Sequence, residues 1–309
     1  RQQTPTRFQP ERKIHTRADA LIFRAKAFLL QLRRGAQNLV NSDLKSFEKS
    51  DALSAQSVVA ESKTALWTEK DRAEMPLMAG KIQNLRLAVR RLDGVEIPAD
   101  QIFSFWKQIG RASKRRGFVR GRELREGCVI PNVGGGLCQL SNALYDAALK
   151  ANFEVVERHA HTQILTGSLA EQGRDATVFW NYVDLRFRSD AAFRVEAEMD
   201  ATHLIVRFRA ERKKRQTPVE IKTRKQISVL NNAPNSCVTC GVGECFRSEK
   251  PATSATSAED DSIDFGVFAF LLDEFSPEFD EYVQRARRAK DHLFIPLDGA
   301  RFGKSNYAW

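Results

Sequence analysis

The hydrophobic pattern of the sequence predicts an α+β fold. Apolar residues recur at spacings of three and four over 14–40 and 77–92, as on one face of a helix, but alternate every second residue from 153 onward, as in strands. In addition, the stretch GGGLCQLSNALYDAALK (134–150) places three glycines before a helical pattern. We therefore expect a glycine-led helix over 137–151 packed on a mostly antiparallel sheet, with a basic helical N-terminal region and a small cysteine-rich C-terminal extension.

Two helices are predicted before the glycine run. The first, over 14–40, is basic and amphipathic, and we expect it to pack on the domain, with an anionic membrane surface as the alternative partner. Residues 41–75 are polar and weakly patterned. In the second helix, over 77–92, one face carries a regular apolar series, Ile82, Leu85, Val89 and Leu92.

The period changes after the glycine-led helix, and strands are predicted. Residues 153–161, 175–188, 194–199 and 203–210 alternate between apolar and polar side chains. A turn at 200–202 joins the last two strands, which makes them an antiparallel pair. This alternation is typical of a sheet with one face exposed to water.

The composition is that of a globular protein and limits its partners. Of 309 residues, 42% are hydrophobic and 28% are charged. The net charge of +10 gathers in 1–34, 114–125 and 211–226 without a recognisable nucleic-acid motif. We expect mostly solvated charge and no specific nucleic-acid partner, with an anionic lipid, wall polymer or nucleotide as the alternative.

The domain plan and the localisation follow from composition along the chain. We predict a basic helical region, an α+β core, a basic linker with a cysteine knuckle, and an acidic linker that opens a further segment, over 1–75, 76–210, 211–250 and 251–309. The chain begins without a Met or a visible signal peptide and ends abruptly, so we expect truncation at either end. Five cysteines with tight spacing favour a reducing compartment, and thus the cytoplasm, with membrane association as the alternative.

Four segments together resemble the VanW-like family. They are KIQNLRLAVRRLDGVEIPADQIFSFW, GGGLCQLSNALYDAAL, VVERHAHT and GRDATVFWNYVDLRF, in that order, and they cover roughly 80–190. The resemblance implies a link to the cell envelope, to peptidoglycan and to glycopeptide resistance, with a cell-wall precursor or another anionic small molecule as the partner. The cysteine knuckle and the C-terminal segment lie outside the shared part.

Cys138 is the candidate nucleophile. It lies in the first turn of the predicted helix, where free amide N–H groups and the helix dipole favour a thiolate and can hold a developing oxyanion. The glycines allow close backbone approach, and Asn142 and Tyr145 follow Cys138 along one stripe. We predict a substrate-binding set around it: Gly134, Gly135, Gly136, Gln139, Asn142, Tyr145 and Trp106.

The base and its orienting group are predicted from the next strands. Strand alternation would point Glu157, His159 and His161 to one side, and Asp175 opens the following strand. The order Cys, His, Asp is similar to that of transglutaminase-like and papain-like enzymes, with either histidine as base. Three interpretations stay open: a cysteine-dependent acyl transferase or amidohydrolase, a non-catalytic cell-wall or sugar-binding accessory protein, and a His-x-His metal site completed by Asp175, Glu157 or Cys138.

The knuckle NSCVTCGVGECFR suggests a second site. Cys237, Cys240 and Cys245 have the spacing of part of a zinc or iron–sulfur chelate, and the glycines between them let the chain turn back. A closed zinc site needs a fourth ligand, for which Cys128, His203 or an external group are candidates. A Cys237–Cys240 redox pair is the metal-free alternative.

Overall fold

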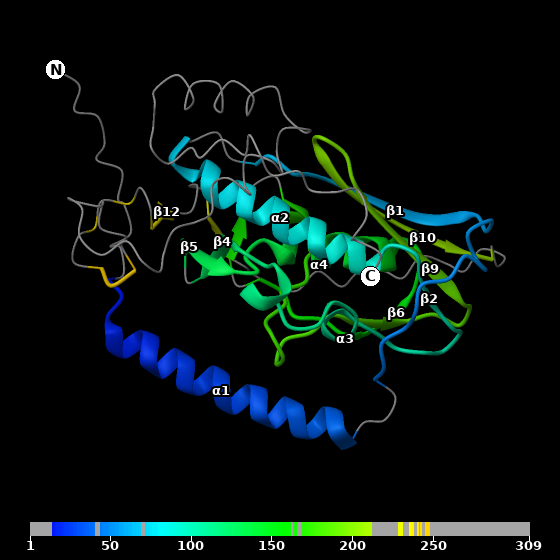
Figure 1. Ribbon diagram of the computed structural model, residues 1–309, viewed down its shortest axis with the longest axis horizontal. Helices are drawn as coiled ribbons and strands as arrows, with labels where there is room; N and C mark the ends of the chain where they lie inside the picture. The colour runs from blue at the N-terminus through cyan, green and yellow to red at the C-terminus, as the bar shows by residue number, and fades with distance from the viewer. Residues whose placement is uncertain are drawn as a thin grey trace, which may run out of the picture.

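The computed structural model describes residues 14–40, 44–68, 72–125, 127–161, 163–165, 168–211, 228–230, 235–237, 240, 242 and 245–247. These residues form the predicted α+β fold (Figure 1). The helices are α1 (Arg17–Val40), α2 (Met75–Leu92), α3 (Phe105–Ile109) and α4 (Leu137–Lys150), with short 3-10 turns η1 (Arg72–Glu74), η2 (Lys114–Arg116) and η3 (Leu169–Gln172).

The described strands form four sheets, and most pairings are antiparallel. The largest has the order β1-β10-β9-β2, with β1 (Val58–Ala65), β2 (Val95–Ile97), β9 (Phe193–Met199) and β10 (His203–Ala210). A second has the order β3-β8-β6, with β3 (Phe103–Ser104), β6 (Glu154–Glu157) and β8 (Arg186–Arg188). The others are β12-β5-β4 and β11-β7, with β4 (Arg120–Arg125), β5 (Cys128–Val133), β7 (Gln163–Leu165), β11 (Ser228–Leu230) and β12 (Asn235–Ser236).

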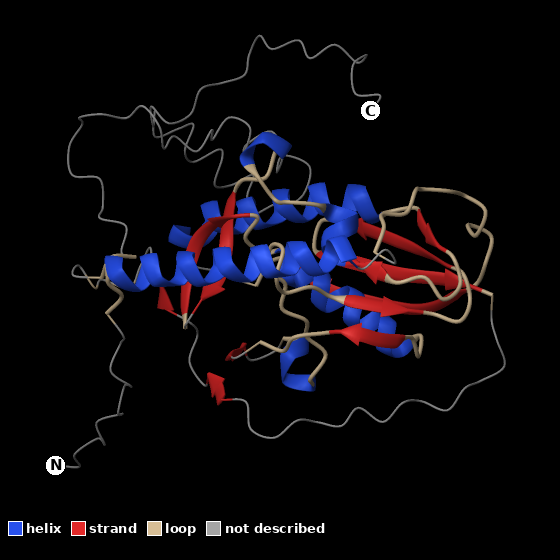
Figure 2. Cartoon of the chain, turned by 90° about the horizontal axis from the view of Figure 1, so that it is seen from below, coloured by secondary structure: helices blue, strands red, loops and turns tan. Residues whose placement is uncertain are grey.

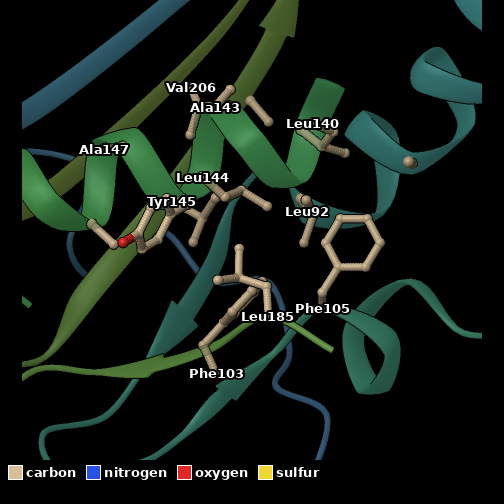
Figure 3. Close-up of a cluster of buried hydrophobic side chains, with 14 of the residues drawn as sticks. Leu92, Phe103, Phe105, Leu140, Ala143, Leu144, Tyr145, Ala147, Leu185 and Val206 are labelled. Carbon is tan, nitrogen blue, oxygen red and sulfur yellow. The ribbon is translucent and has the colours of Figure 1, made fainter. Parts of the chain in front are cut away.

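The core lies between helices α2 and α4 and the strands (Figures 1 and 2). In Figure 3, Leu140 and Leu144 of α4 point toward a group that includes Phe105 and Leu185. All four of these side chains are fully buried. The prediction that α4 packs on the sheet by its leucine face is therefore confirmed, as is the apolar face of α2. Aromatic rings fill the space beneath: Phe103, Phe153, Phe187, Phe193 and Phe208.

Two predicted strands are much shorter than expected, and several strands were not predicted, among them β1 and the antiparallel pair β4 and β5. The strand over 153–161 ends at Glu157, and only 186–188 of the segment 175–188 is a strand. Backbone groups of Ala176 and Val178 instead bond to side chains of α4, which holds this segment away from the regular ladder. β1 falls in the weakly patterned region 41–75. Its inward residues, Ala60 and Ser62, are small, so the sequence gives no hydrophobic signal of a strand there.

Helix α1 lies along one side of the domain, and its orientation contradicts the expectation that its apolar stripe packs on the core (Figures 1 and 2). Leu21, Leu29 and Leu39 are 69%, 63% and 88% exposed. The opposite, more polar face contacts the domain, as described below. None of the described helices is long and apolar enough to cross a membrane.

Several predictions lie outside the described residues. The segment 251–309 and nearly all of the linker 211–227 belong there, so the predicted domain boundaries stay predictions. The knuckle cysteines are described individually, together with the strand β12 that precedes them.

Candidate functional site

The glycine run sets the start of α4. Gly134 and Gly136 have positive φ values of 80° and 99°, which side chains other than glycine rarely adopt. Gly135 has no such need, but a Cβ there would collide with the carbonyl of Gly121 in β4. The glycines thus let the loop turn and pack closely on β4, so that α4 begins at Leu137 and Cys138 lies in its first turn.

A buried asparagine fixes this loop from the side. The Asn84 amide of α2 donates to the carbonyls of Gly135 at 2.9 Å and Val119 at 3.0 Å, and its carbonyl accepts from the Val119 amide at 2.9 Å. All three bonds satisfy backbone groups that lie outside the regular helices and strands. Since Asn84 is fully buried, these bonds are screened from water and hold the loop that positions Cys138.

Cys138, His161 and Asp175 lie in one row. The Nδ1 of His161 lies 2.7 Å from the Asp175 Oδ2, and the Cys138 thiol, next to the imidazole, helps to raise its pKa. The Cys138 sulfur lies 3.9 Å from the Val178 carbonyl. Cys138 is half-buried, the His161 side chain is 18% exposed, and Asp175 is buried. The predicted nucleophile, base and orienting group are therefore in contact.

Both carboxylate oxygens of Asp175 take part in hydrogen bonds. One oxygen accepts from the His161 backbone amide at 2.6 Å as well as from the imidazole, and the other accepts from Arg158 at 2.7 Å. Arg158 also donates to the Asp175 carbonyl at 2.6 Å and lies over the Tyr145 ring at 5.1 Å. These bonds fix the carboxylate so that it holds the imidazole in one orientation.

The electrostatic environment of this row favours the charged forms of His161 and Asp175. Burial alone would lower the pKa of His161, but hydrogen bonds from Asp175 and Cys138 outweigh it and raise the pKa to about 10. Burial would likewise raise the pKa of Asp175, yet the hydrogen bonds and charge of His161 and the charge of Arg158 bring it below its ordinary value. His161 is therefore an imidazolium at neutral pH, paired with a carboxylate.

The stripe of α4 that begins at Cys138 holds the segment that carries Asp175. Asn142 accepts from the Ala176 amide at 2.8 Å, and Ser141 donates to the Ala176 carbonyl at 2.6 Å. Together with the Cys138–Val178 contact, these bonds tie residues 176–178 to the first half of α4. This explains why the segment leaves the strand geometry that alternation predicted.

The other predicted site residues lie apart from the row. His159 is about half exposed and faces Glu157 at 3.4 Å, so the two histidines diverge. Trp106 is buried in the core, where its ring donates to the Val183 carbonyl at 2.8 Å. Gln139 bonds the edge of β1, at Thr64 and at the Ala65 carbonyl. Of the three residues predicted to share one side, Glu157 and His159 lie together, whereas His161 pairs with Asp175 because the strand ends at Glu157.

Two side chains that hold the site in place, Arg158 and Asn84, were not predicted from the sequence. Strand alternation would have pointed Arg158 away from the histidines, and no spacing signal marks it. Asn84 lies on the buried face of α2, where an uncharged polar residue between Ile82 and Leu85 is a usable signal of a buried hydrogen-bonding role.

The knuckle cysteines gather near β5. β12 pairs in parallel with β5, so that Asn235 lies opposite Cys128, and the Cys237 amide donates to the Val129 carbonyl at 2.9 Å. The thiols of Cys128 and Cys237 lie close enough for each to shift the pKa of the other. Burial, with the nearby Cys128, Cys240 and Cys245, raises the pKa of Cys237 to about 12. Among the described residues, no group of three or more His, Cys, Asp or Glu side chains stands in metal-binding geometry.

These features define the class: an α+β protein with a cysteine in the first turn of a glycine-led helix, beside a His161–Asp175 pair. Residues 80–209 match the family described as VanW like protein, so this region of the chain is similar to the VanW-like family. It is 30% identical over 133 residues to the vancomycin B-type resistance protein VanW of Enterococcus faecalis, covering 42% of this chain and 48% of that protein.

A second relative gives the same picture. The uncharacterized protein YoaR of Bacillus subtilis is 31% identical over 106 residues, which is 34% of each chain. The similarity thus spans a third to a half of the length of these two relatives. No solved structure matches.

Proposed function

We propose that the VanW-like region is a cysteine-dependent enzyme that transfers an acyl group or hydrolyses an amide of the cell envelope. The observation that carries this proposal is the row of Cys138, His161 and Asp175, in which His161 is hydrogen-bonded to Asp175 and lies next to Cys138. An imidazolium next to a thiol stabilises the thiolate, which is the nucleophilic form of cysteine. A packing role for Cys138 would require neither a charged partner nor a buried carboxylate behind it.

The reaction proceeds through a thioester. The Cys138 thiolate attacks the substrate carbonyl carbon, and the N–H groups of the first turn of α4 stabilise the negative charge that develops on oxygen. His161 donates its proton to the leaving amine as the C–N bond breaks. Water or an acceptor amine then attacks the thioester and gives a proton to His161, and Cys138 leaves as thiolate. Asp175 holds the imidazole throughout.

The envelope substrate is supported by the role of one relative. The relative from Enterococcus faecalis is a vancomycin B-type resistance protein, and glycopeptide resistance concerns the cell wall. The competing accessory-protein proposal needs exposed aromatic rings for sugar stacking. It loses support because Trp106, the aromatic ring of the predicted substrate-binding set, is buried in the core. The His-x-His metal proposal loses support because His159 turns away from His161.

The test uses p-nitrophenyl acetate as an acyl donor and mass spectrometry as the readout. We expect one acetyl group on the wild-type chain, located on Cys138 by peptide mapping, and its loss through turnover. Cys138→Ala removes the adduct, and His159→Gln, the matched control for the neighbouring histidine, keeps it. Acetylation spread evenly over the five cysteines, or as slow in the native as in the denatured chain, would overturn the proposal.

A second candidate function is metal or cluster binding at the cysteine knuckle. The specific observation is the contact of Cys237 with Cys128, which adds a fourth thiol to Cys237, Cys240 and Cys245. Four thiolates suit zinc or an iron–sulfur cluster, and coordination would draw the sulfurs into the required tetrahedral geometry.

Metal and labile-sulfide analysis of anaerobically purified protein tests this second candidate. We expect about one zinc ion, or one cluster, per chain, and its loss in Cys128→Ser but not in Cys138→Ser, the control at the fifth cysteine. Protein that carries neither zinc nor iron, or equal metal in both variants, would contradict it.

A further inference from the structure

We propose that α1 is an interfacial helix that binds the surface of a bilayer containing anionic phospholipids. The proposal starts from the inverted orientation of this helix. Its outward face carries Leu21, Ile22, Phe28, Leu29, Leu32 and Leu39, which are 53–88% exposed. An uninterrupted apolar stripe of this length on a solvent face marks an interaction surface.

The inward face of α1 is held by polar contacts, so the orientation is specific. Arg34 forms an ion pair with Glu157 of β6 and donates to the Tyr182 carbonyl at 3.2 Å. Asn38 accepts from Arg186 at 3.1 Å, and Arg125 lies over the Phe23 ring at 4.5 Å. Rotating α1 to bury its leucines would break all of these contacts. The apolar stripe therefore faces outward because the polar side of the helix is fixed to the domain.

The basic residues beside the apolar stripe of α1 indicate what binds to it. On a helix of 100° per residue, Arg17 and Arg24 lie along one edge of the apolar stripe, and Lys26 and Arg33 lie along the other. All four are exposed. Basic residues at both edges place their charges at the level of lipid headgroups while the apolar side chains enter the acyl region. A second copy of the chain fits less well, since a twofold contact through this stripe would bring these cations together.

The contacts of α1 also locate the membrane relative to the candidate site. Glu157, which pairs with Arg34, is the last residue of β6 and lies four positions before His161. A chain bound through α1 would hold the Cys138 row near the bilayer surface, a consequence that rests on the proposed function. The binding itself does not depend on that function.

The experiment is co-sedimentation of the full chain with vesicles of neutral phosphatidylcholine, with and without phosphatidylglycerol. We expect binding at least tenfold stronger to the anionic vesicles and weakened by salt. Leu29→Glu should lower this binding by roughly tenfold or more. Gln37→Glu, an equal charge change at an exposed position of α1 outside the stripe, should change it less than about threefold.

Three outcomes would overturn the proposal. One is equal partition of wild-type protein and Leu29→Glu onto anionic vesicles. Another is a wild-type dimer in light scattering that Leu29→Glu converts to monomer, with no vesicle binding by either, which would assign the stripe to a second copy. The third is an equal loss of binding in Leu29→Glu and Gln37→Glu. Circular dichroism confirms that both variants keep their helices, and acetylation of Cys138 reports the proposed function separately.

Discussion

Helices α4 and α1 have similar amphipathic patterns in the sequence, yet they use their apolar faces in opposite ways. The leucines of α4 are fully buried against the sheet, while those of α1 face outward and its polar side contacts the domain. Periodicity identifies a helix with two faces, but it does not say which face meets the protein. That is decided by the contacts available to the polar side: Arg34 and Asn38 have partners on the domain.

The largest effect should separate the two leucine faces. Leu144→Ala in α4 opens a cavity at a fully buried position, and we expect it to lower the free energy of unfolding by about 2–5 kcal/mol. Leu29→Ala in α1 removes a side chain that is 63% exposed, and the expected change is within about 0.5 kcal/mol. Urea unfolding of both variants measures this difference. Equal losses would show that α1 is packed as a core helix.

Substituting one glycine before α4 and one glycine in α1 tests the same comparison. The expected changes in the free energy of unfolding are smaller, and they have opposite signs at the two positions. Gly135→Ala places a Cβ against the Gly121 carbonyl, and we expect a loss of about 1–3 kcal/mol together with slower alkylation of Cys138. Gly35→Ala in α1 meets no atom within 4 Å and should stabilise the chain by about 0.5–1 kcal/mol. Thermal and urea unfolding check both signs. A stabilising Gly135→Ala would mean that the loop does not need its close approach to β4.

The sequence allowed prediction of those parts of the site and fold that depend on local pattern. α4, the leucine face and the residue types of the row follow from spacing and chemistry. The contact of His161, rather than His159, with Asp175 could not be predicted, because β6 ends two residues before His159 and alternation fails there. Arg158 and β1 were missed for a similar reason: their roles depend on tertiary partners and not on neighbours in the sequence.

A third effect, smaller still, concerns the charged row beside α4. The pKa of His161 is raised to about 10, so its contribution to stability is full below its unfolded pKa, about 6.5, and is lost as the pH rises through about 10. We expect His161→Gln to lower the free energy of unfolding by on the order of 1–2 kcal/mol near pH 6 and by almost nothing above about pH 10.5. The matched change His159→Gln, at a half-exposed position, should have little effect at either pH.

The difference between wild type and variant is the quantity to measure, because another buried group titrates in the same range. Burial, with the charge of Arg122, lowers the pKa of Lys81 to about 7, and this contribution is common to both proteins and cancels. A difference that grows with pH would contradict the assignment of His161 as the imidazolium partner of Asp175.

The central claim, that Cys138 is a nucleophile activated by His161 and Asp175, is tested most directly by its alkylation rate. Iodoacetamide labelling of the native chain from about pH 5.5 to pH 9.5, read by peptide mapping, isolates Cys138 from the other four cysteines. We predict that at neutral pH Cys138 is labelled at least about tenfold faster in wild type and in His159→Gln than in His161→Gln. Labelling of Cys138 at the same rate in all three proteins would contradict the account.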